Sequence, residues 1–352
     1  MTRALLVKTK IMATLLVGAL ITTAAVLITT VGERPSSERP KEAEGKGAEL
    51  EVDLGRRIAE FSAEVVTDAH YRPPDRTERD TVADGVALYL DGKREEAARR
   101  LAEADFRIQI IRDTAAGDAG ANGADGTDGT DASRGRRYAE IADRGGAAAE
   151  SRRGWGRVYI ALGAPVSYSV QVPHPVADAH SDALGVGILR GAPGGVLVIA
   201  GAHRRAGEGN AADMAHRTDT VFHAVCEQFA ARRMPGIQVH GFADASDPAH
   251  DIVVSPGIGE EGRPRAETLS DDLGEDGFRV CRAWLDSRCQ LAGRTNEQGR
   301  LAAKENLPFL HVEVNRTVRD DGKLRALAVE AMRAATWPGT ASRSPAPGPL
   351  GR

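Results

Sequence analysis

From residue 156 to residue 335, short apolar runs alternate with segments in which apolar residues recur every three or four positions. The short runs are typical of buried strands, and the longer spacing is typical of amphipathic helices. We expect strands in RVYIAL, SYSVQV, GGVLVIAG, GIQVHGF, DIVVSPG, FRVCRAW and PFLHVEVN. We expect helices in HSDALGVGILRG, HRTDTVFHAVCEQFAARR, RAETLSDDLGEDG, NEQGRLAAKEN and KLRALAVEAMRAA. The alternation predicts an α/β fold whose mainly parallel or mixed sheet carries helices on both faces.

The segment before this region contains further helical and strand patterns. Helical spacing is seen in LGRRIAEFSAEVVTDAH and TVADGVALYLDGKREEAARRLAEA, and an apolar strand pattern in FRIQIIRD. We therefore expect one folded domain over residues 49–336. Residues 114–135 are rich in Gly, Ala and Asp and predict a surface insertion, while residues 32–48 and 337–352 are polar and Pro-bearing and predict a linker and a disordered tail.

Residues 11–31 form an apolar stretch without a single charge, and a basic segment, residues 1–10, precedes it. As a helix, 21 residues span roughly 30 Å, which is the thickness of a bilayer core. The pattern predicts a transmembrane signal-anchor with the basic segment in the cytoplasm and the C-terminal domain outside the cell. The alternative is a cleaved signal peptide, which would make the protein secreted.

Composition and charge narrow the possible partners. The chain has 352 residues, of which 46 are basic and 50 acidic, and its net charge is -4. Because the charges are spread along the chain without a basic stripe, we expect no nucleic-acid partner. Cys281 and Cys289 bracket seven residues, so they form either a disulfide in an oxidising compartment or two reduced thiols. Cys226 lies in a helical pattern and resembles a small buried apolar residue.

Polar residues occur where the predicted strands end. The stretch QVPHPVAD places His174 and Asp178 directly after one strand, and His240 lies near the end of GIQVHGF. Ligands of parallel sheets bind outside the carboxyl ends of the strands. A catalytic zinc ion needs about three protein ligands and one open position, so these three residues can form such a site.

Glu313 is the candidate general base of this site. It lies in the strand pattern HVEVNR between Val312 and Val314, so its side chain points to the opposite face from these two valines. A carboxylate in such a position can take a proton from an attacking water. The alternative is an ion pair between Glu313 and Arg316 or Arg319.

The order of these motifs resembles that of the zinc carboxypeptidase superfamily, and especially its N-formylglutamate amidohydrolase branch. The motifs are PH-x-x-x-D, then ADMAHRTD, a strand ending in His, and a late VEVNR. The resemblance implies a Zn²⁺ cofactor held by His174, Asp178 and His240, with Glu313 as general base and Arg217 bound to a substrate carboxylate. It departs from the family in two places: Asp178 stands four residues after the His, where carboxypeptidases have Glu three residues after, and His216 replaces an Asn.

A second alignment with known motifs is also open. The segment GAHRRAGE offers His203 and Glu208, similar to the first ligands of phage-type poly-gamma-glutamate hydrolases. His240 and Glu313 keep their roles in both alignments. We further expect five polar residues to line the substrate side of the cleft: His203, His216, Arg294, Asn296 and Arg316.

These features together predict an extracytoplasmic zinc-dependent amide hydrolase that acts on a small-molecule, peptide or cell-wall amide. The alternative is a non-catalytic, membrane-anchored binding module on the same scaffold. A serine hydrolase is not expected, because the sequence contains no G-x-S-x-G motif.

Overall fold

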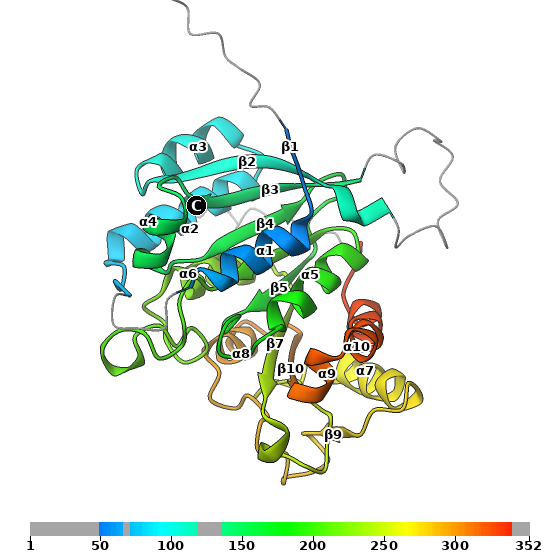
Figure 1. The fold of residues 1–352 in the computed structure, drawn as a ribbon. Helices are drawn as coiled ribbons and strands as arrows, with labels where there is room; N and C mark the ends of the chain where they lie inside the picture. The colour runs from blue at the N-terminus through cyan, green and yellow to red at the C-terminus, as the bar shows by residue number, and fades with distance from the viewer. Residues whose placement is uncertain (1–48, 66–70, 118–134, 340–352) are drawn as a thin grey trace, which may run out of the picture. The chain divides into compact units, whose positions relative to one another are not determined.

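The computed structural model describes residues 49–65, 71–117 and 135–339. These residues form a mixed sheet of ten strands with helices on both faces, so the predicted α/β fold is confirmed (Figure 1). The strands are β1 (Leu50–Val52), β2 (Phe106–Asp113), β3 (Arg136–Asp143), β4 (Arg157–Ala161), β5 (Tyr168–Val172), β6 (Gly195–Ile199), β7 (Gly236–Phe242), β8 (Ile252–Ser255), β9 (Val280–Arg282) and β10 (Phe309–Asn315).

Most of the helices follow the predicted segments closely. They are α1 (Leu54–Ala63), α2 (Arg76–Leu90), α3 (Arg94–Ala102), α4 (Ala147–Arg153), α5 (Ser181–Gly191), α6 (Val221–Ala231), α7 (Arg263–Glu275), α8 (Glu297–Lys304), α9 (Arg316–Asp320) and α10 (Gly322–Ala334). Gly92, with a φ of 80°, separates α2 from α3 as its position between two apolar-faced segments suggests.

The strand order is β1-β2-β3-β4-β6-β5-β7-β10-β8-β9. The central strands β6, β5, β7 and β10 are parallel, which fits the predicted alternation of strands and helices. On one side, β8 runs antiparallel to β10 and pairs with β9. On the other side, β2, β3, β4 and β6 pair antiparallel in succession. The sheet is therefore mixed: antiparallel pairs flank the parallel centre, and the outermost pairs, β1 with β2 and β8 with β9, are parallel again.

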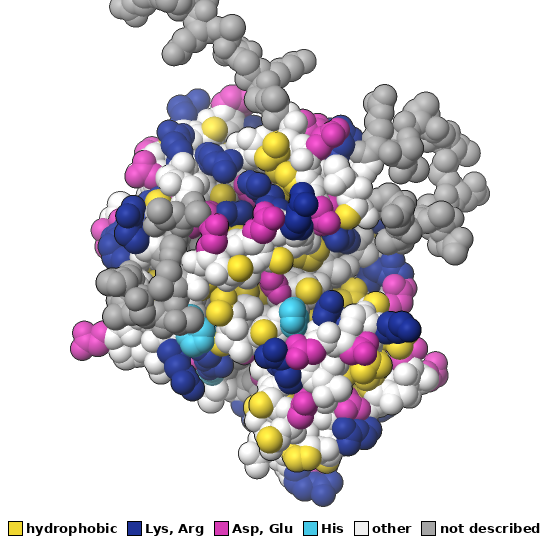
Figure 2. All heavy atoms as spheres, in the orientation of Figure 1, with side chains coloured by type: hydrophobic (Ala, Val, Ile, Leu, Met, Phe, Trp, Pro, Cys, Tyr) yellow, Lys and Arg dark blue, Asp and Glu magenta, His cyan; other side chains and the backbone are white. Residues whose placement is uncertain are grey.

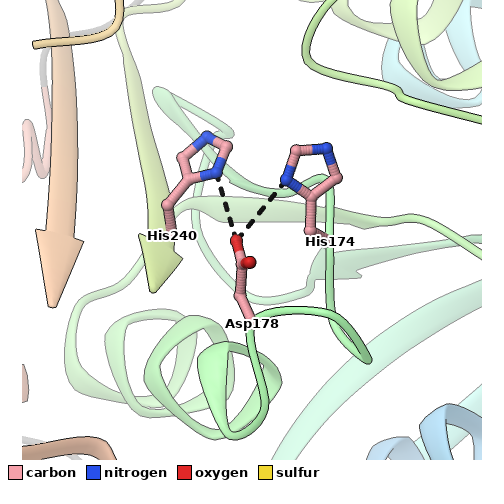
Figure 3. A group of neighbouring side chains, drawn as sticks. All are labelled: His174, Asp178 and His240. Atoms are coloured by element: carbon pink, nitrogen blue, oxygen red, sulfur yellow. Dashed lines mark ion pairs between the residues drawn. The ribbon is translucent and has the colours of Figure 1, made fainter. Parts of the chain in front are cut away.

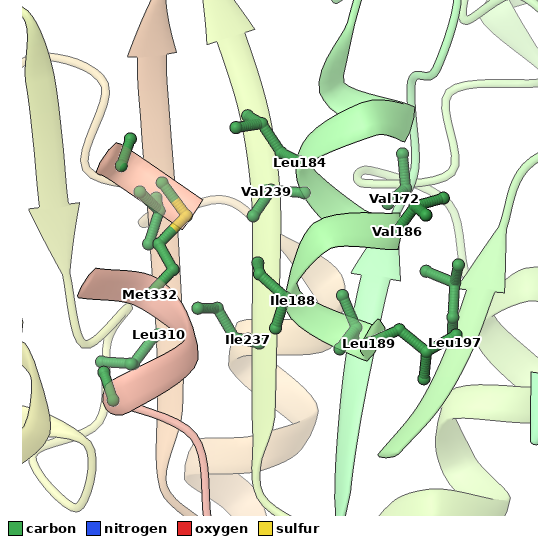
Figure 4. Close-up of a cluster of buried hydrophobic side chains, with 14 of the residues drawn as sticks. Val172, Leu184, Val186, Ile188, Leu189, Leu197, Ile237, Val239, Leu310 and Met332 are labelled. Atoms are coloured by element: carbon green, nitrogen blue, oxygen red, sulfur yellow. The ribbon is translucent and has the colours of Figure 1, made fainter. Parts of the chain in front are cut away.

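One face of the central strands is mostly apolar. Ile237 and Val239 of β7 pack there against Leu184 and Ile188 of α5, and all four side chains are fully buried (Figure 4). Helices α1, α7 and α10 complete the same layer. Each such side chain contributes roughly 1.5–3 kcal/mol to folding by leaving water, so this layer holds the sheet in place.

The opposite face is covered by α2, α3 and α6 over the first half of the sheet and by α6 and α8 over β5, β7 and β10. On the face of the molecule in Figure 2, acidic and basic side chains are interspersed. Cys281 and Cys289 form a disulfide with a Cα–Cα distance of 6.0 Å, and Cys226 is a buried free thiol in α6.

Two strands were not expected from the sequence. The pattern RRYAEIAD, which forms β3, carries several charges, and β1 has only three residues. Of the predicted insertion, residues 114–117 form a short 3₁₀ turn, and residues 118–134 lie outside the described residues. The predicted linker 32–48 and most of the predicted tail, residues 340–352, also lie outside them, so the domain boundaries stay predictions.

The predicted membrane location is corrected by the structure. Among the described residues no helix is both long and apolar enough to cross a bilayer, and the longest, α2, has 15 residues, or about 22 Å. The basic segment 1–10 and the apolar segment 11–31, which gave rise to the prediction, lie outside the described residues.

Candidate metal centre

The register of β5, β7 and β10 places the polar residues of these strands on one face. Glu313 of β10 lies opposite His240 of β7, and His311 lies opposite Gln238. Gln171 of β5 also lies opposite Gln238. Because side chains alternate along a strand, the intervening Val and Ile residues point to the apolar face. The polar side chains of these three strands therefore face α6 and α8, because polar and apolar residues alternate in the sequence.

The loop between β5 and α5 brings His174 and Asp178 to the end of β7. The Asp178 N–H donates to the His174 carbonyl at 2.9 Å, and the Ser181 N–H donates to the Asp178 carbonyl at 2.9 Å. His180 has a φ of 67°, which reverses the chain just before α5 begins. The turn explains how two residues four positions apart present their side chains to the same point.

His174, Asp178 and His240 converge there (Figure 3). The Asp178 Oδ2 lies 3.4 Å from the His174 Nδ1 and 3.3 Å from the His240 Nδ1. All three residues are buried, with exposed fractions of 1%, 5% and 4% in sequence order. The geometry brings together the three residues that the first alignment selects.

The other ring nitrogens of the two histidines are already engaged. The His174 Nε2 lies 2.8 Å from the Asp213 Oδ1, and the His240 Nε2 lies 2.7 Å from the Gln238 Oε1. Both partner oxygens accept, so each Nε2 carries a hydrogen, and a ring that is neutral then presents a lone pair at Nδ1. The buried His174 Nδ1 has no hydrogen-bond partner. With both rings neutral, the two Nδ1 atoms and the Asp178 Oδ2 are three acceptors that face one another, and a cation between them would satisfy all three. Two imidazoles and one carboxylate form a ligand set that suits Zn²⁺.

Burial and hydrogen bonding shift the pKa values of these groups. Burial lowers the pKa of His240 to about 4 despite its contact with Asp178, so its ring is neutral. Burial also acts against a charged His174, but the contacts with Asp178 and Asp213 outweigh it and raise the pKa of His174. Burial would raise the pKa of Asp178, but the two histidines hold it well below its usual range. Asp178 is therefore ionised and available as a ligand.

Glu313 lies beside this group with 12% of its side chain exposed. Burial, reinforced by the negative charge of Asp178, raises its pKa well above the ordinary value. Its Oε1 lies 3.9 Å from the His311 Nε2, and His240, His311 and Glu313 form a second group of ligand atoms within 4.8 Å of one another.

The two arginines that could have formed an ion pair with Glu313 have other partners. Arg316 pairs with Asp320 at 2.6 Å, and Arg319 donates to the main-chain carbonyls of Val314 and Phe242. The Glu313 carboxylate is thus left facing the metal group.

Arg204 brings a positive charge to the site. Its Nη2 lies 2.9 Å from the Asp213 Oδ2, while the other oxygen of Asp213 accepts from His174 and His216. The Arg204 side chain is 34% exposed, and its charge counteracts the rise in the pKa of Glu313. Sequence reasoning did not select Arg204 or Asp213 for this role; the position of GAHRR directly after a strand was the available signal.

The second alignment finds less support in the geometry. The His203 Nδ1 accepts from the Arg205 N–H at 3.2 Å, and Glu208 is exposed at the start of a 3₁₀ turn. In the described part of the chain, His203 and Glu208 belong to none of the groups of close ligand atoms. Another such group, Asp247, His250 and Cys281, contains a disulfide-bonded sulfur and is therefore not a thiolate site.

Of the other residues predicted to bind substrate, two contact partners of the metal group. His216 contacts Asp213 at 3.1 Å, and the Asn296 amide donates to Gln238 while its oxygen caps α8. Arg217 is engaged by Asp219 at 2.9 Å. Arg294 is exposed and lines a pocket of about 310 Å³ with Trp284.

No family model matches this chain, and no curated protein sequence matches it. Solved structures do match it. An N-formylglutamate amidohydrolase from Ralstonia eutropha aligns at 14% identity over 49% of this chain and 94% of its own, with a TM-score of 0.36. A metallo-carboxypeptidase from Pseudomonas aeruginosa aligns at 11% identity over 51% of this chain and 60% of its own, with a TM-score of 0.33. An N-acetylmuramoyl-L-alanine amidase from Nostoc punctiforme aligns at 11% identity over 49% of this chain and 96% of its own, with a TM-score of 0.30.

Two of these matched structures carry the names of the kinds of protein that the sequence motifs resemble, an amidohydrolase and a metallo-carboxypeptidase. At these identities and TM-scores, the assignment of a function depends on the geometry of the site itself.

Proposed function

We propose that the protein is a zinc-dependent amide hydrolase whose ion is held by His174, Asp178 and His240. The observation that supports this proposal is the convergence of two Nδ1 atoms and one carboxylate oxygen, with both Nε2 atoms already bound to acceptors. When bound at an open three-residue site, zinc supplies a Lewis acid for the amide carbonyl and lowers the pKa of water.

In this proposal Glu313 moves the proton. Its carboxylate accepts the proton of the attacking water and then delivers it to the leaving amine nitrogen. The direction of its pKa shift suits the task, because a carboxyl group with a raised pKa can hold the proton between the two steps. Its neighbour His240 belongs to the metal group, so the carboxylate and the ion would act on the same amide.

Arg204 would stabilise the negative charge that develops on the carbonyl oxygen or a carboxylate of the substrate. One of its nitrogens is fixed by Asp213, which orients the guanidinium, and its side chain is partly open to solvent. His216 contacts Asp213 and Asn296 contacts Gln238, so both lie next to residues that hold the metal group. Binding of substrate by Arg217, His203, Arg294 and Arg316 stays a prediction, as does the class of amide: a small molecule, a peptide or a cell-wall fragment.

The test combines metal analysis with hydrolysis of a panel of N-acyl amino acids and dipeptides. We expect one zinc ion per wild-type chain, loss of the ion in His240→Ala, and retention of the ion with loss of hydrolysis in Glu313→Gln. Glu330→Gln serves as the matched control, since its carboxylate is exposed and pairs with Arg333. A wild-type chain that takes up no stoichiometric zinc would contradict the proposal and favour a non-catalytic binding module.

A further inference from the structure

A line of buried amide side chains connects the main chain at Met214 to His240. The Gln298 Nε2 donates to the Met214 carbonyl at 2.9 Å and to the His223 Nδ1 at 3.1 Å. The Gln238 Nε2 donates to the Gln298 Oε1 at 3.1 Å, and the Gln238 Oε1 faces the His240 Nε2 at 2.7 Å. Gln238 and Gln298 are exposed by no more than 1%.

The direction of this line follows from what each group can do. A main-chain carbonyl only accepts, so the Gln298 atom that contacts Met214 must be its NH₂ group. The remaining atom of Gln298 is then an oxygen, which requires the NH₂ group of Gln238. The remaining atom of Gln238 is again an oxygen, and it requires a hydrogen on the His240 Nε2.

Gln171 fixes Gln238 a second time in the same direction. The second hydrogen of the Gln238 Nε2 goes to the Gln171 Oε1 at 3.0 Å, and the Gln171 Nε2 donates to the Ser169 Oγ at 3.1 Å. The Asn296 amide nitrogen also donates to the Gln238 Oε1. A rotated Gln238 amide would set its oxygen against the oxygens of Gln171 and Gln298 and its NH₂ group against that of Asn296.

We propose that Gln238 is a positioning residue that holds His240 in the tautomer whose Nδ1 can bind the metal ion. Two groups compete for the single proton of the neutral ring. Asp178, 3.3 Å from Nδ1, draws the proton to Nδ1, which would close the ligand position with a hydrogen bond. The Gln238 oxygen draws it to Nε2 and leaves the Nδ1 lone pair free. The part that concerns metal binding depends on the proposed function, whereas the tautomer is a property of the chain itself.

The test compares Gln238→Met with Gln171→Met, which removes a buried amide that contacts Gln238 but not His240 and leaves the contacts of Gln238 with Gln298 and Asn296 in place. In the full-length, metal-free protein with ¹⁵N-labelled histidine, the signals of His240 are assigned by their loss in His240→Gln. We expect an Nε2–H ring in the wild type and in Gln171→Met, and an Nδ1–H ring in Gln238→Met. Zinc affinity, measured against a chromophoric chelator, should fall by about 10- to 100-fold in Gln238→Met.

Two results would overturn the proposal: an Nδ1–H ring in the wild type, or a Gln238→Met variant with the tautomer and zinc affinity of Gln171→Met. If Gln238→Met does not fold, Gln298→Met replaces it. That variant removes the anchor to Met214 and should shift part of the His240 population to the Nδ1–H form. If the wild type binds no zinc, the proposed function fails, while the tautomer measurement still decides this inference.

Discussion

The guanidinium of Arg319 occupies the space in which a side chain at Gly241 would lie. A Cβ atom on Gly241 would be 2.2 Å from the Arg319 Cζ, well inside contact distance. Arg319 is 3% exposed and donates from Nε to the Val314 carbonyl at 2.9 Å and from Nη2 to the Phe242 carbonyl at 3.0 Å; its Nη1 donates to the Ala179 carbonyl. One buried cation thus joins the ends of β10 and β7 to the loop after β5.

These three segments carry Glu313, His240 and Asp178, so displacement of Arg319 should disturb both folding and the metal centre. We expect Gly241→Ala to lower the free energy of unfolding by about 1–3 kcal/mol and to weaken zinc binding. Urea denaturation and chelator competition measure the two effects. Gly274→Ala is the matched control, because Gly274 lies in α7 with nothing near its Cβ position, and it should be neutral or slightly stabilising. Equal behaviour of the two variants would contradict this role for Arg319.

Asp213 should control the affinity for the ion through His174. Its Oδ1 accepts from the His174 Nε2 at 2.8 Å and thereby holds the Nδ1 toward Asp178. We expect Asp213→Ala to weaken zinc binding by about 10- to 100-fold, because the ring loses its fixed tautomer and orientation. Asp219→Ala, which removes a carboxylate that only pairs with Arg217, should leave zinc affinity within twofold of the wild type.

Arg204 should affect the reaction and not the metal content. If its guanidinium stabilises charge on the reacting carbonyl, Arg204→Ala should lower the rate of hydrolysis by about 10²–10³-fold while the zinc content stays at the wild-type level. The neighbouring Arg205 is exposed, and Arg205→Ala is the control. A rise in KM alone in Arg204→Ala would instead indicate that Arg204 binds a substrate carboxylate in the ground state.

Glu140 of β3 should contribute to stability in a pH-dependent way. Its side chain is fully buried, and Arg57, Arg157 and Arg107 approach its carboxylate, with Arg57 at 2.8 Å from Oε1. Burial would raise the pKa of Glu140, but the arginines outweigh it and hold the pKa below the usual 4.5. A carboxyl group whose pKa is lower in the folded state stabilises the fold above its unfolded pKa, and this contribution is lost as the pH falls through the folded pKa.

We therefore expect Glu140→Gln to lower the free energy of unfolding by about 1–3 kcal/mol at pH 7, since it removes the charge that pairs with the part-buried Arg57, while Arg157 keeps Glu150 as a partner. The difference from the wild type should shrink as the pH is lowered below 4.5. Urea denaturation across this pH range is the measurement. Glu330→Gln, on an exposed helix face, should remain within about 0.5 kcal/mol of the wild type at every pH.

The strands of the central sheet could be predicted, because their short apolar runs indicate burial without reference to residues elsewhere in the chain. The strand β3 could not, because its Glu140 is buried beside arginines from other parts of the chain, among them Arg57, which lies 83 residues away. The proximity of His174, Asp178 and His240, in contrast, could be predicted, because ligand-binding residues gather where parallel strands end.

Arg204 and Gln238 were overlooked because their roles arise from contacts with Asp213 and His240, which depend on the folded arrangement. A single glutamine inside an apolar strand pattern, such as Gln238 between Ile237 and Val239, does not by itself indicate a functional role. The signal that could have been used is the pair Gln171 and Gln238, which occupy matching positions of two predicted strands and lie opposite each other in the sheet.

The unequal faces of β7 have a consequence for folding. Ile237 and Val239 point to one side of this strand, and Gln238 and His240 point to the other. If the register of β7 shifted by one residue, the Gln238 amide and the His240 imidazole would enter the apolar layer between the sheet and α5. Gln238 and His240 thus destabilise any shifted register of β7. With aliphatic residues at both positions, the free-energy difference between the correct and the shifted register would become small.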